Sequence, residues 1–405
     1  MRLGLTNLPR DTWLLLSARG ARSLGQGALI VDFALYLKAM HWSAPAIGAL
    51  FTVGLLLDAG LVTISGALSD RFGRKPFLLV YEVLQTIAAV VAIVTAVPVL
   101  LVVATLIGGF GRGANGSSGP FAPVELSWLS QPLASKSRGP VYSANMAIGF
   151  TGMGLGALLG ALPVVFSSVL PGALSFRPLF GVSLIGSLCC LVLLWRAHDQ
   201  PIESRPAARN DNDRAETRQE NGVLMRLFGI TALNGIAIGL IGPLMAYWFA
   251  VRFGRGPESI GPVMAAAYFV TAASSLIAGR LVARVGVIRA VVWMRAAGLL
   301  ILLALPLVPS FWIAAGLHVA RSALNRGTAG ARQALTVSLV RPHRRGVAAS
   351  TSNVAVQLPR AAGPLGAGLL FGGGFLAAPF YIAAGFFGVY IILYARTFAA
   401  YDPSR

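Results

Sequence analysis

The sequence is long, apolar and strongly basic. Its 405 residues are 56% hydrophobic and only 12% charged, with a mean hydropathy of +0.73, whereas a soluble domain usually carries about 25% charged residues. Apolar runs of about 20 residues, the length of a hydrocarbon core, recur along the whole chain. The composition therefore excludes a soluble globular protein and indicates an all-α, polytopic integral membrane protein.

Twelve segments are long and apolar enough to cross a bilayer. Backbone groups in lipid have no water to bond, so each segment is expected to be a helix. The first segment is charged and lacks a small-residue cleavage site, so we expect no signal peptide. The predicted spans are 12–38, 44–66, 77–97, 98–120, 139–169, 178–196, 223–251, 258–279, 289–308, 311–331, 346–372 and 375–396.

The basic residues gather on one side of the predicted membrane. The loops on the side of the termini hold 20 Lys and Arg, against four on the other side: Lys38, Arg177, Arg252 and Arg255. The positive-inside rule then places both termini in the cytoplasm. An Arg-rich and Ala-rich composition favours a GC-rich bacterium, so we expect a bacterial inner membrane. The net charge of +19 therefore marks topology and lipid attraction and excludes nucleic acid as the expected partner.

The first span carries a polar stripe. Its members are Arg19, Arg22, Gln26, Asp32 and Tyr36. At about 100° per residue they fall within an arc of roughly 140° on one helix face. An isolated Arg at the centre of a membrane helix costs about 2.5–3.5 kcal/mol, so such side chains face a cavity or a partner. We expect this helix to line a substrate cavity, with internal ion pairing as the alternative.

Asp32 is the candidate for proton coupling. Desolvation disfavours a charged carboxylate and a nearby cation favours it, and the opening and closing of a cavity changes both influences. Substrate binding can then compete with the proton. Asp58 in the second span and Glu82 in the third are the alternative carriers.

A short charged segment, GALSDRFGRKP at 66–76, separates the second and third spans. Its Lys and Arg alone would hold the loop in the cytoplasm, but that role does not require Asp70. A carboxylate at this place can approach a helix N-terminus and pair with an Arg. Glu125, near the cytoplasmic end of the fourth span, is a further expected partner.

The chain reads as two related halves. Residues 196–222 are polar, mixed in charge and without an apolar face, which predicts a flexible cytoplasmic linker. This linker separates a first six-helix bundle, 1–195, from a second, 223–405.

An internal echo supports that division. GRLVARVGVIR, which begins at Gly279, repeats part of the segment that begins at Gly66, and two further echoes come in the same order. Three echoes in order favour duplication. Ala283 stands in the echo where the first half has Asp70, so we expect the Asp-dependent contact only in the first half.

Other polar side chains lie at depth in the predicted spans. They are Arg112, Asn115, Asn234, Tyr247, Arg321, Asn325, Gln357 and Arg360. Buried Arg outnumbers buried acid, and Arg binds carboxylate and phosphate bidentately, which favours an anionic substrate. The alternative is that several of these Arg side chains pair with helix ends or with Glu125.

Three motifs carry a resemblance to a known family. The segment at 66–76 matches the signature loop G-x-L-a-D-r-x-G-r-k, and RGANGSSG at 112–119 resembles a second motif, an Arg followed by small residues. In the fifth span GMGLGALLGA keeps the glycines of an antiporter motif but has Ala157 and Ala161 where the motif has Pro and Gly. The chain thus resembles the major facilitator superfamily. The matched signature positions are Gly66, Leu68, Asp70, Arg71, Gly73, Arg74 and Lys75.

The resemblance implies two six-helix bundles that rock about a central site near the membrane midplane. It also implies a latch at the cytoplasmic gate that stabilises the outward-facing state. The residues expected in this gate are Gly66, Asp70, Arg71, Gly73, Arg74 and Glu125.

We therefore expect a secondary transporter that exports a small organic solute in exchange for protons. The alternatives are proton-coupled uptake of an organic anion and, from another class, a non-transporting membrane sensor or scaffold. The four His show no metal-ligand spacing and no catalytic triad is arranged, so we expect no enzyme, no metal and no cofactor. The expected partners are the solute, protons and the lipid bilayer, with the protein as a monomer.

Overall fold

The computed structural model describes residues 8–111, 119, 122–130, 135–199, 212–327, 332, 335–336, 339–341 and 345–398. Their regular structure is entirely helical. The elements are α1 (Arg10–Ala39), α2 (Ala44–Phe72), α3 (Arg74–Val94), α4 (Pro98–Gly108), α5 (Ala122–Ser130), α6 (Ser135–Leu158), η1 (Leu159–Ala161), α7 (Leu162–Val165), η2 (Gly172–Phe176), α8 (Arg177–Arg196), α9 (Asn212–Ile241), α10 (Met245–Phe253), α11 (Pro257–Val285), α12 (Val287–Ala304), η3 (Leu305–Leu307), α13 (Phe311–Gly327), α15 (Arg345–Arg360), α16 (Gly363–Gly372) and α17 (Ala378–Phe398).

Most predicted spans coincide with one helix or with helices in series. The span predicted at 98–120 does not, because α4 ends at Gly108, where Gly109 takes a left-handed conformation, and residues 112–118 lie outside the described part of the chain. Seven stretches among the described helices are long and apolar enough to cross a membrane on their own. The other spans depart from that simple pattern for physical reasons. α1 carries buried charges, while breaks at Gly242–Leu244 and at Ala361–Ala362 divide two further spans into α9 with α10 and α15 with α16. The all-helical membrane fold is confirmed.

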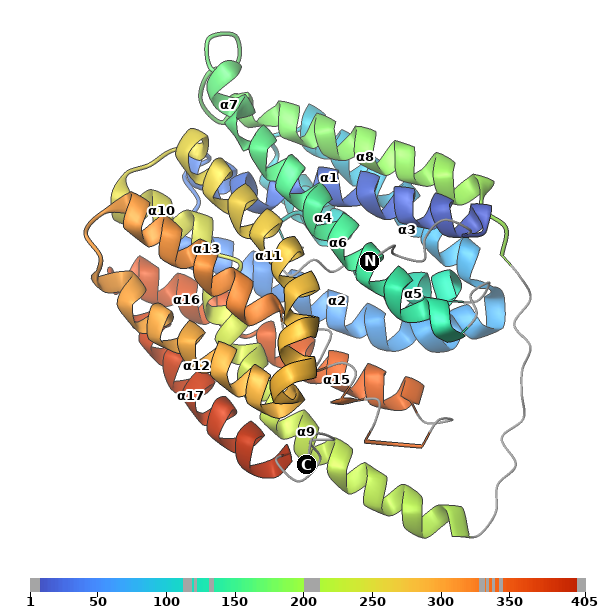
Figure 1. Cartoon of the computed structure of the whole chain (residues 1–405). Helices are drawn as coiled ribbons and strands as arrows, with labels where there is room; N and C mark the ends of the chain where they lie inside the picture. Colours follow the sequence, from blue (N-terminus) through green and yellow to red (C-terminus); the bar gives the residue numbers. More distant parts are fainter. Residues whose placement is uncertain are drawn as a thin grey trace.

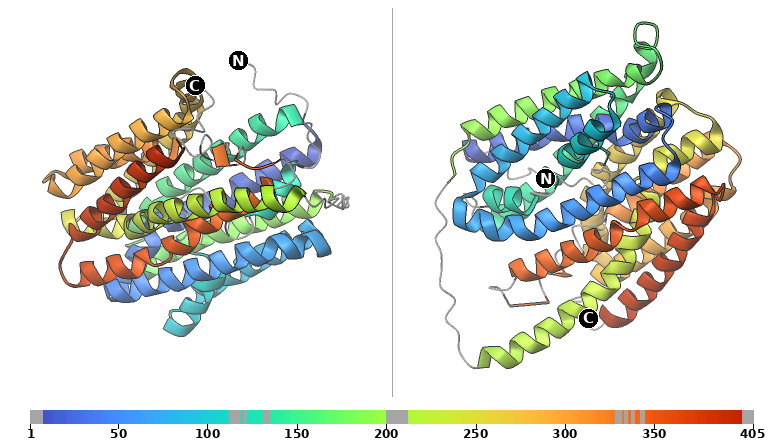
Figure 2. Two further views of the ribbon diagram at one scale, coloured as in Figure 1. Left: turned by 90° about the horizontal axis from the view of Figure 1, so that it is seen from below. Right: turned by 180° about the vertical axis from the view of Figure 1, so that it is seen from behind.

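The helices gather in two groups that follow the order of the chain (Figures 1 and 2). α1 lies between α6 and α8 and is buried along most of its length. Glycines make this contact possible: a side chain at Gly156 would collide with the carbonyl oxygen of Leu24, and one at Gly186 would come within 2.7 Å of the carbonyl oxygen of Ala21. The glycines of the fifth span therefore serve helix packing against α1.

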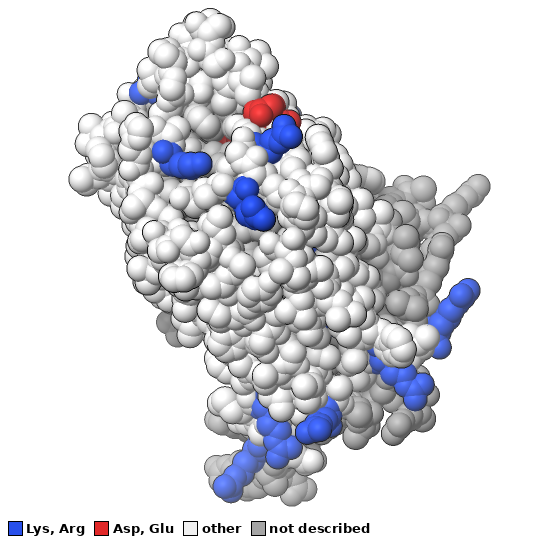
Figure 3. Space-filling view, turned by 90° about the vertical axis from the view of Figure 1, so that its left-hand side faces the viewer, with Lys and Arg blue, Asp and Glu red and all other residues white. Residues whose placement is uncertain are grey.

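The surface has the charge distribution of a membrane protein. In Figure 3 the Lys and Arg side chains gather at two ends of the face in view, and the broad area between them is white. Large apolar side chains such as Trp293, Val99 and Leu300 are 69–76% exposed on the described helices. A surface of exposed apolar side chains is typical of contact with lipid.

Backbone geometry supports the internal repeat. Gly73 and Gly286 occupy the same position in the signature segment and in its echo. Their backbone angles are φ 87°, ψ 157° and φ 87°, ψ 158° respectively. A positive φ of this kind favours glycine, and each glycine immediately precedes a helix, α3 or α12. The two loops are thus built alike, although Asp70 is replaced by Ala283.

The predicted linker is shorter in the structure than in the sequence analysis, because α9 begins at Asn212. Both ends of it are held by neighbouring elements. Asp199 accepts hydrogen bonds from the backbone N–H groups of Arg74 and Lys75, at 2.9 and 3.1 Å. At the other end Arg341 donates to Glu220 at 2.9 and 3.0 Å. We call the end of the molecule that carries these contacts the linker side. The division into two six-helix domains stays a prediction.

Candidate functional site

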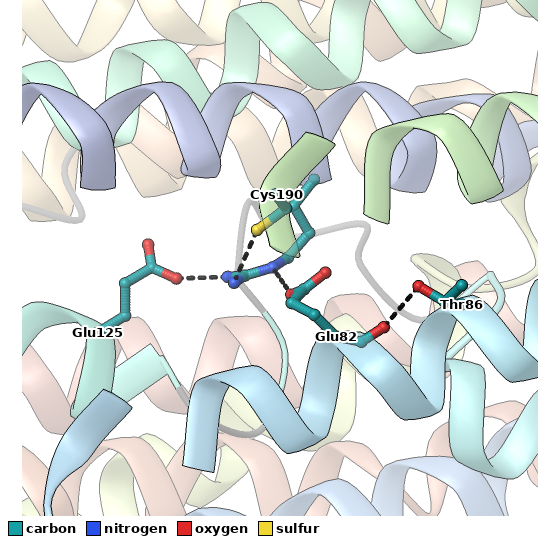
Figure 4. A network of polar contacts seen from close by, with 5 residues as sticks. Glu82, Thr86, Glu125 and Cys190 are labelled. Carbon is teal, nitrogen blue, oxygen red and sulfur yellow. Dashed lines mark hydrogen bonds and ion pairs between the residues drawn. The ribbon is translucent and has the colours of Figure 1, made fainter. Parts of the chain in front are cut away.

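The polar stripe of α1 begins in an internal ion-pair network (Figure 4). The guanidinium of Arg22 donates from Nε to Glu82 Oε1 at 2.5 Å and from Nη1 to Glu125 Oε2. Its Nη2 lies 3.4 Å from the sulfur of Cys190. Arg22, Glu82 and Glu125 are each at most 3% exposed. One cation from α1 is therefore held by carboxylates from α3 and α5, with a thiol from α8 beside it.

Arg19 completes a balanced set of charges. It is 2% exposed, and the charges of Arg22 and Glu125 both act on it. Two cations and two carboxylates are thus buried together inside the first half. This is the internal pairing that the sequence analysis left open as the alternative, and a cavity role for Arg22 stays a prediction.

Asp32 lies elsewhere on α1 and in a different environment. The residue is fully buried, and neither carboxylate oxygen has a hydrogen-bond partner among the residues that the structure describes. A side chain at Gly160 would come within 2.6 Å of Asp32 Oδ2, and Gly160 itself packs against Gly261 of α11. Glu258, at the start of α11, is the charge that acts on Asp32. The carboxylate therefore sits where the first half meets the second.

The other members of the stripe pack within the first half. Tyr36 is 3% exposed and its ring contacts the rings of Phe180 and Phe176, at centroid distances of 5.3 and 5.9 Å. Gln26 is half-buried, and its Oε1 has no hydrogen-bond partner within the described part of the chain. The cavity roles predicted for both side chains remain untested.

The signature loop is described only in part. Gly66 and the side chains of Asp70 and Arg71 lie outside the described residues, so the latch stays a prediction. Lys75 Nζ donates to the carbonyl oxygens of Trp195 and Ala197, at 2.7 and 2.8 Å. A cation at the C-terminus of a helix is favoured by the exposed carbonyls and the helix dipole. The loop thus fixes the end of α8.

The same place ties several first-half elements together. The carbonyl oxygen of His198 accepts from Trp128 Nε1 at 3.1 Å, and its backbone N–H donates to Asp11 Oδ1 at 3.2 Å. Asp199 also accepts hydrogen bonds from the start of α3. These contacts together join the ends of α1, α3, α5 and α8 on the linker side. Glu125, predicted as a gate residue, contacts Arg22 deeper in the bundle.

The second half buries Arg295 beside a neutral partner. Arg295 Nη1 of α12 donates to Asn234 Oδ1 of α9 at 2.7 Å, and the residue is 2% exposed. Its guanidinium carbon lies 5.7 Å from the ring centroid of Phe387 and 5.5 Å from that of Tyr390, both on α17. Arg321 of α13 lies 5.8 Å from the same Phe387 ring. Among the described residues, aromatic faces and an amide, and no carboxylates, surround these two cations.

Two further arginines reach toward the first half. Arg326 of α13 lies 5.3 Å from the ring centroid of Tyr268 and donates a hydrogen bond to its hydroxyl. Arg360 of α15 is 1% exposed, donates to Gln357 Oε1 at 3.2 Å, and is attracted by Asp58 of α2. The structure therefore brings Gln357 and Arg360 together.

Asn325 lies apart from this group. A side chain at Gly298 of α12 would come within 2.6 Å of Asn325 Oδ1, so the amide packs at the junction of α12 and α13. Arg112 and Asn115 lie outside the described residues, and their predicted cavity roles are not tested.

The two halves meet through small residues at the ends of the helices opposite the linker side. A side chain at Gly48 of α2 would collide with the carbonyl oxygen of Pro364, at the start of α16. The N–H of Leu365, freed by the break between α15 and α16, donates to Thr52 Oγ1 at 3.1 Å. Lys38 of α1 lies 5.8 Å from the ring centroid of Tyr247, which stacks on Phe371 of α16. We call these contacts, with Gly160 against Gly261, the inter-half seam.

Arg295 and Tyr268 are the residues that sequence reasoning missed. A signal for Arg295 existed, since it takes the place of Glu82 when the echo at Gly279 is aligned with the segment at Gly66. Tyr268 gave no signal, because one tyrosine in an apolar helix is ordinarily a packing residue.

Relatives of the chain match over part of its length. The uncharacterized MFS-type transporter YdeE of Escherichia coli (strain K12) is 28% identical over 166 residues, which are 41% of this chain and 40% of that protein. Multidrug resistance protein MdtH of Klebsiella pneumoniae (strain 342) is 26% identical over 156 residues, 35% of this chain and 37% of that protein. The chain therefore spans about two fifths of the length of these relatives.

Solved structures share the fold over nearly the whole chain. A bacterial homologue of the human lysosomal transporter Spinster superposes with a TM-score of 0.70 at 16% identity, covering 97% of this chain and 98% of that chain. The nucleoside transporter NupG gives 0.73 at 13% identity, covering 96% and 100%. At these identities the likeness shows the fold alone.

The sequence pattern of the Major Facilitator Superfamily matches residues 15–223 and 227–405, which is almost the entire chain. The match includes the signature segment at 66–76 and its echo at Gly279. The chain therefore belongs to the major facilitator superfamily, a family of secondary membrane transporters and not of enzymes.

Proposed function

We propose that this transporter exports a small organic solute in exchange for protons, by alternating access. The observation that carries the proposal is Asp32, a fully buried carboxylate without a hydrogen-bond partner among the described residues. An ionised carboxylate is costly in such a place, so a buried acid either binds a proton or gains a partner when the structure changes. Intramembrane acids of this kind mark proton pathways.

The position of Asp32 in the inter-half seam supports a coupling role. Separation of α11 from η1 would remove Gly261 from Gly160, and water could then reach the carboxylate. Hydration favours the charged form and closure of the seam favours the protonated form. The negative charge of Glu258, at the start of α11, acts on the same carboxylate. Movement of the halves would therefore bind and release one proton.

The proposed orientation places both termini in the cytoplasm of a bacterium, with the protein in the inner membrane. The excess of Lys and Arg in the loops of the linker side supports this orientation. The inter-half seam would then lie toward the outside, as expected for a state closed to the exterior. Export is supported by the relatives that carry the name multidrug resistance protein and by the glycines of the fifth span.

Proteoliposomes test the coupling. A solute identified by its stabilisation of the purified protein is loaded, a pH gradient is imposed, and internal pH and solute are followed together. Asp32→Asn should abolish proton-driven flux while keeping solute exchange without a gradient. Cys189→Ser is the control, because this exposed side chain on α8 takes no part in the proposed coupling. Undiminished proton-driven flux in the Asp32 variant would overturn the proposal.

The same experiment separates the rival functions. Uptake of an organic anion predicts the opposite direction of solute movement under the same gradient. A sensor or scaffold predicts no flux at all, although ligand binding could persist. The direction of solute movement can be measured without knowing the charge of the solute. Binding experiments determine that charge separately.

A further inference from the structure

The second half has almost no negative charge of its own. From Val223 to Arg405 the only acidic residues are Glu258 and Asp402. Glu258 lies at the start of α11 and accepts a hydrogen bond from the backbone N–H of Gly256 at 3.2 Å. Asp402 belongs to the terminus outside the described residues. No acidic side chain from this half therefore reaches the middle of its described helices.

Four arginines nevertheless lie inside it. Arg295, Arg321 and Arg360 are 2%, 8% and 1% exposed, and Arg326 is half-buried. The charges of Arg295, Arg321, Arg326 and Arg360 act on one another in a chain that runs through α12, α13 and α15. Each isolated Arg in a membrane helix costs about 2.5–3.5 kcal/mol, and mutual repulsion adds to this cost.

The partners of these arginines are mostly neutral. Arg295 has the Asn234 amide, and Arg326 has the hydroxyl of Tyr268. Arg321 faces the ring of Phe387, and its Nε has no hydrogen-bond partner within the described part of the chain. An acidic residue, Asp58, attracts Arg360, and it comes from the first half. The second half thus does not compensate most of its buried positive charge with acids of its own.

Arg326 and Arg360 lie where the two halves face each other. Tyr268, which bonds Arg326, stacks its ring on Phe150 of α6 with centroids 6.4 Å apart. Arg360 faces Asp58 of α2. Of the helices that carry these groups, α11 packs against α6 and α15 packs against α2, so both pairs join the two halves. Both side chains therefore lie at the junction of the two halves.

We propose that Arg326 and Arg360 bind an anionic headgroup of the transported solute, with Tyr268 donating its hydroxyl to it. The inference rests on the proposed transport function and adds the chemical class of the solute: a small organic anion with an aromatic or apolar body. Guanidinium forks bind carboxylate, sulfonate or phosphate through paired hydrogen bonds. The Phe150 ring beside Tyr268 offers an apolar surface to the body of the ligand.

In this arrangement Asp58 occupies the place of a counter-ion in the absence of ligand. Its carboxylate partly neutralises Arg360, and an incoming anion must share or displace it. The site therefore predicts opposite effects for two neighbouring substitutions. Loss of the Arg326 charge weakens anion binding, whereas loss of the Asp58 charge strengthens it.

Binding to the purified full-length protein in detergent tests the proposal. Benzoate, benzenesulfonate and phenylphosphate share one ring and differ in headgroup, while benzyl alcohol and benzylamine supply a neutral and a cationic match. At least one of the anions should raise the melting temperature and bind saturably, because a ligand that binds only the folded state stabilises it. The neutral and cationic compounds should have little effect.

Variants then assign the site. Arg326→Gln should weaken binding of the stabilising anion at least tenfold, Arg326→Lys less, and Asp58→Asn should strengthen it several-fold. Arg255→Gln is the control, since this exposed Arg beside Phe311 lies outside the site and should leave affinity unchanged. Where Arg326→Gln fails to fold, Arg326→Lys and Asp58→Asn decide the outcome.

Two results would overturn the anion site. One is a failure of the anions to stabilise the protein more than benzyl alcohol and benzylamine do, which includes the case in which none of the three anions stabilises it. The other is wild-type affinity in the Arg326 variants together with no gain in Asp58→Asn. Asp32→Asn should still bind the anion, so a failure of proton coupling and a failure of the anion site produce different data.

Discussion

Both halves bury arginines, but the hydrogen-bond partners of these arginines differ in charge. In the first half Arg22 of α1 is bonded to two carboxylates, Glu82 on α3 and Glu125 on α5. In the second half Arg295 on α12 is bonded to the neutral amide of Asn234 on α9. Arg295 holds the position that Glu82 holds in the first half when the signature segment and its echo are aligned. The buried cation thus lies on the first span of the first half but on the third span of the second half.

This difference separates charge that stabilises a bundle from charge that remains available. Arg19, Arg22, Glu82 and Glu125 sum to zero, so the first half needs no external ion to neutralise them. The second half buries Arg295 and Arg321, and half-buries Arg326, without an acid of its own at that depth in its described helices. The Arg22 network is therefore balanced within the first half, whereas the arginines of the second half depend on Asp58 or on a ligand.

The strongest way to break the comparison is to remove the cation from the balanced set. Arg22→Gln leaves two buried carboxylates, Glu82 and Glu125, without their shared partner. Removal of one member of a buried pair costs about 3–5 kcal/mol, so we expect a large drop in melting temperature and aggregation on size-exclusion chromatography. If the variant melted like the wild type, the network would have no structural role.

A double variant controls for the loss of charge. Arg22→Gln combined with Glu82→Gln removes one cation and one carboxylate and leaves Arg19 with Glu125, so the buried charges still sum to zero. Because no carboxylate is left in excess, this variant should recover much of the lost stability. Failure to recover would instead assign the defect to side-chain packing.

Glycine contacts give a second comparison of the halves, with a smaller expected effect. Gly156 on α6 packs against the Leu24 carbonyl of α1, and Gly239 on α9 packs against the Arg360 carbonyl of α15. Alanine at either position collides with backbone, and overpacking typically costs about 1–3 kcal/mol. Both variants should melt at lower temperature. Gly385→Ala is the control, because nothing lies within 4 Å of the Cβ it adds, and an equal loss there would contradict the contact argument.

Much of the fold was predictable because its signals are local. A run of apolar residues predicts a helix wherever it lies in the chain, and most of the predicted spans correspond to helices, although α4 ends at Gly108 within the span predicted at 98–120. The repeat was predictable from the match between the segments at Gly66 and Gly279. The breaks between α9 and α10 and between α15 and α16 went unpredicted, because a Gly-Pro pair in lipid can bend a helix or interrupt it.

The site was harder to predict because pairing depends on distance in space. The helical period placed Arg22 and Asp32 on one stripe of α1, but only the packing of α3 and α5 shows that Arg22 has two carboxylate partners. Asp32 meets a glycine instead, which leaves its carboxylate without a partner among the described residues. A count of charges in the predicted spans indicated that buried Arg outnumbers buried acid. It could not show which of these Arg side chains lie inside the second half without a carboxylate from that half.

A third prediction makes the second half resemble the first. Asn234→Asp would give Arg295 a carboxylate partner in place of an amide. The Nδ2 atom of Asn234 is buried without a hydrogen-bond partner in the described part of the chain, so no bond is lost. An ion pair with a carboxylate replaces a hydrogen bond from the guanidinium to a neutral amide, and we expect a gain of about 1 kcal/mol, seen as a higher melting temperature.

A double-mutant cycle checks the origin of that gain. In the background of Arg295→Met, Asn234→Asp buries a carboxylate that has lost the cation, so it should destabilise the protein. A gain of equal size in both backgrounds would mean that Arg295 is not the partner of the new carboxylate.

The smallest effect is expected at the sulfur beside Arg22. Cys190 Sγ lies 3.4 Å from Arg22 Nη2, but a thiol is a weak acceptor, and the carboxylates of Glu82 and Glu125 already hold the guanidinium. Cys190→Ser should therefore shift the melting temperature no more than Cys189→Ser, its exposed neighbour. A loss comparable with that of Arg22→Gln would show that the sulfur is an essential partner. The two carboxylates would then not be enough to hold Arg22, and the contrast with Arg295 would be weaker.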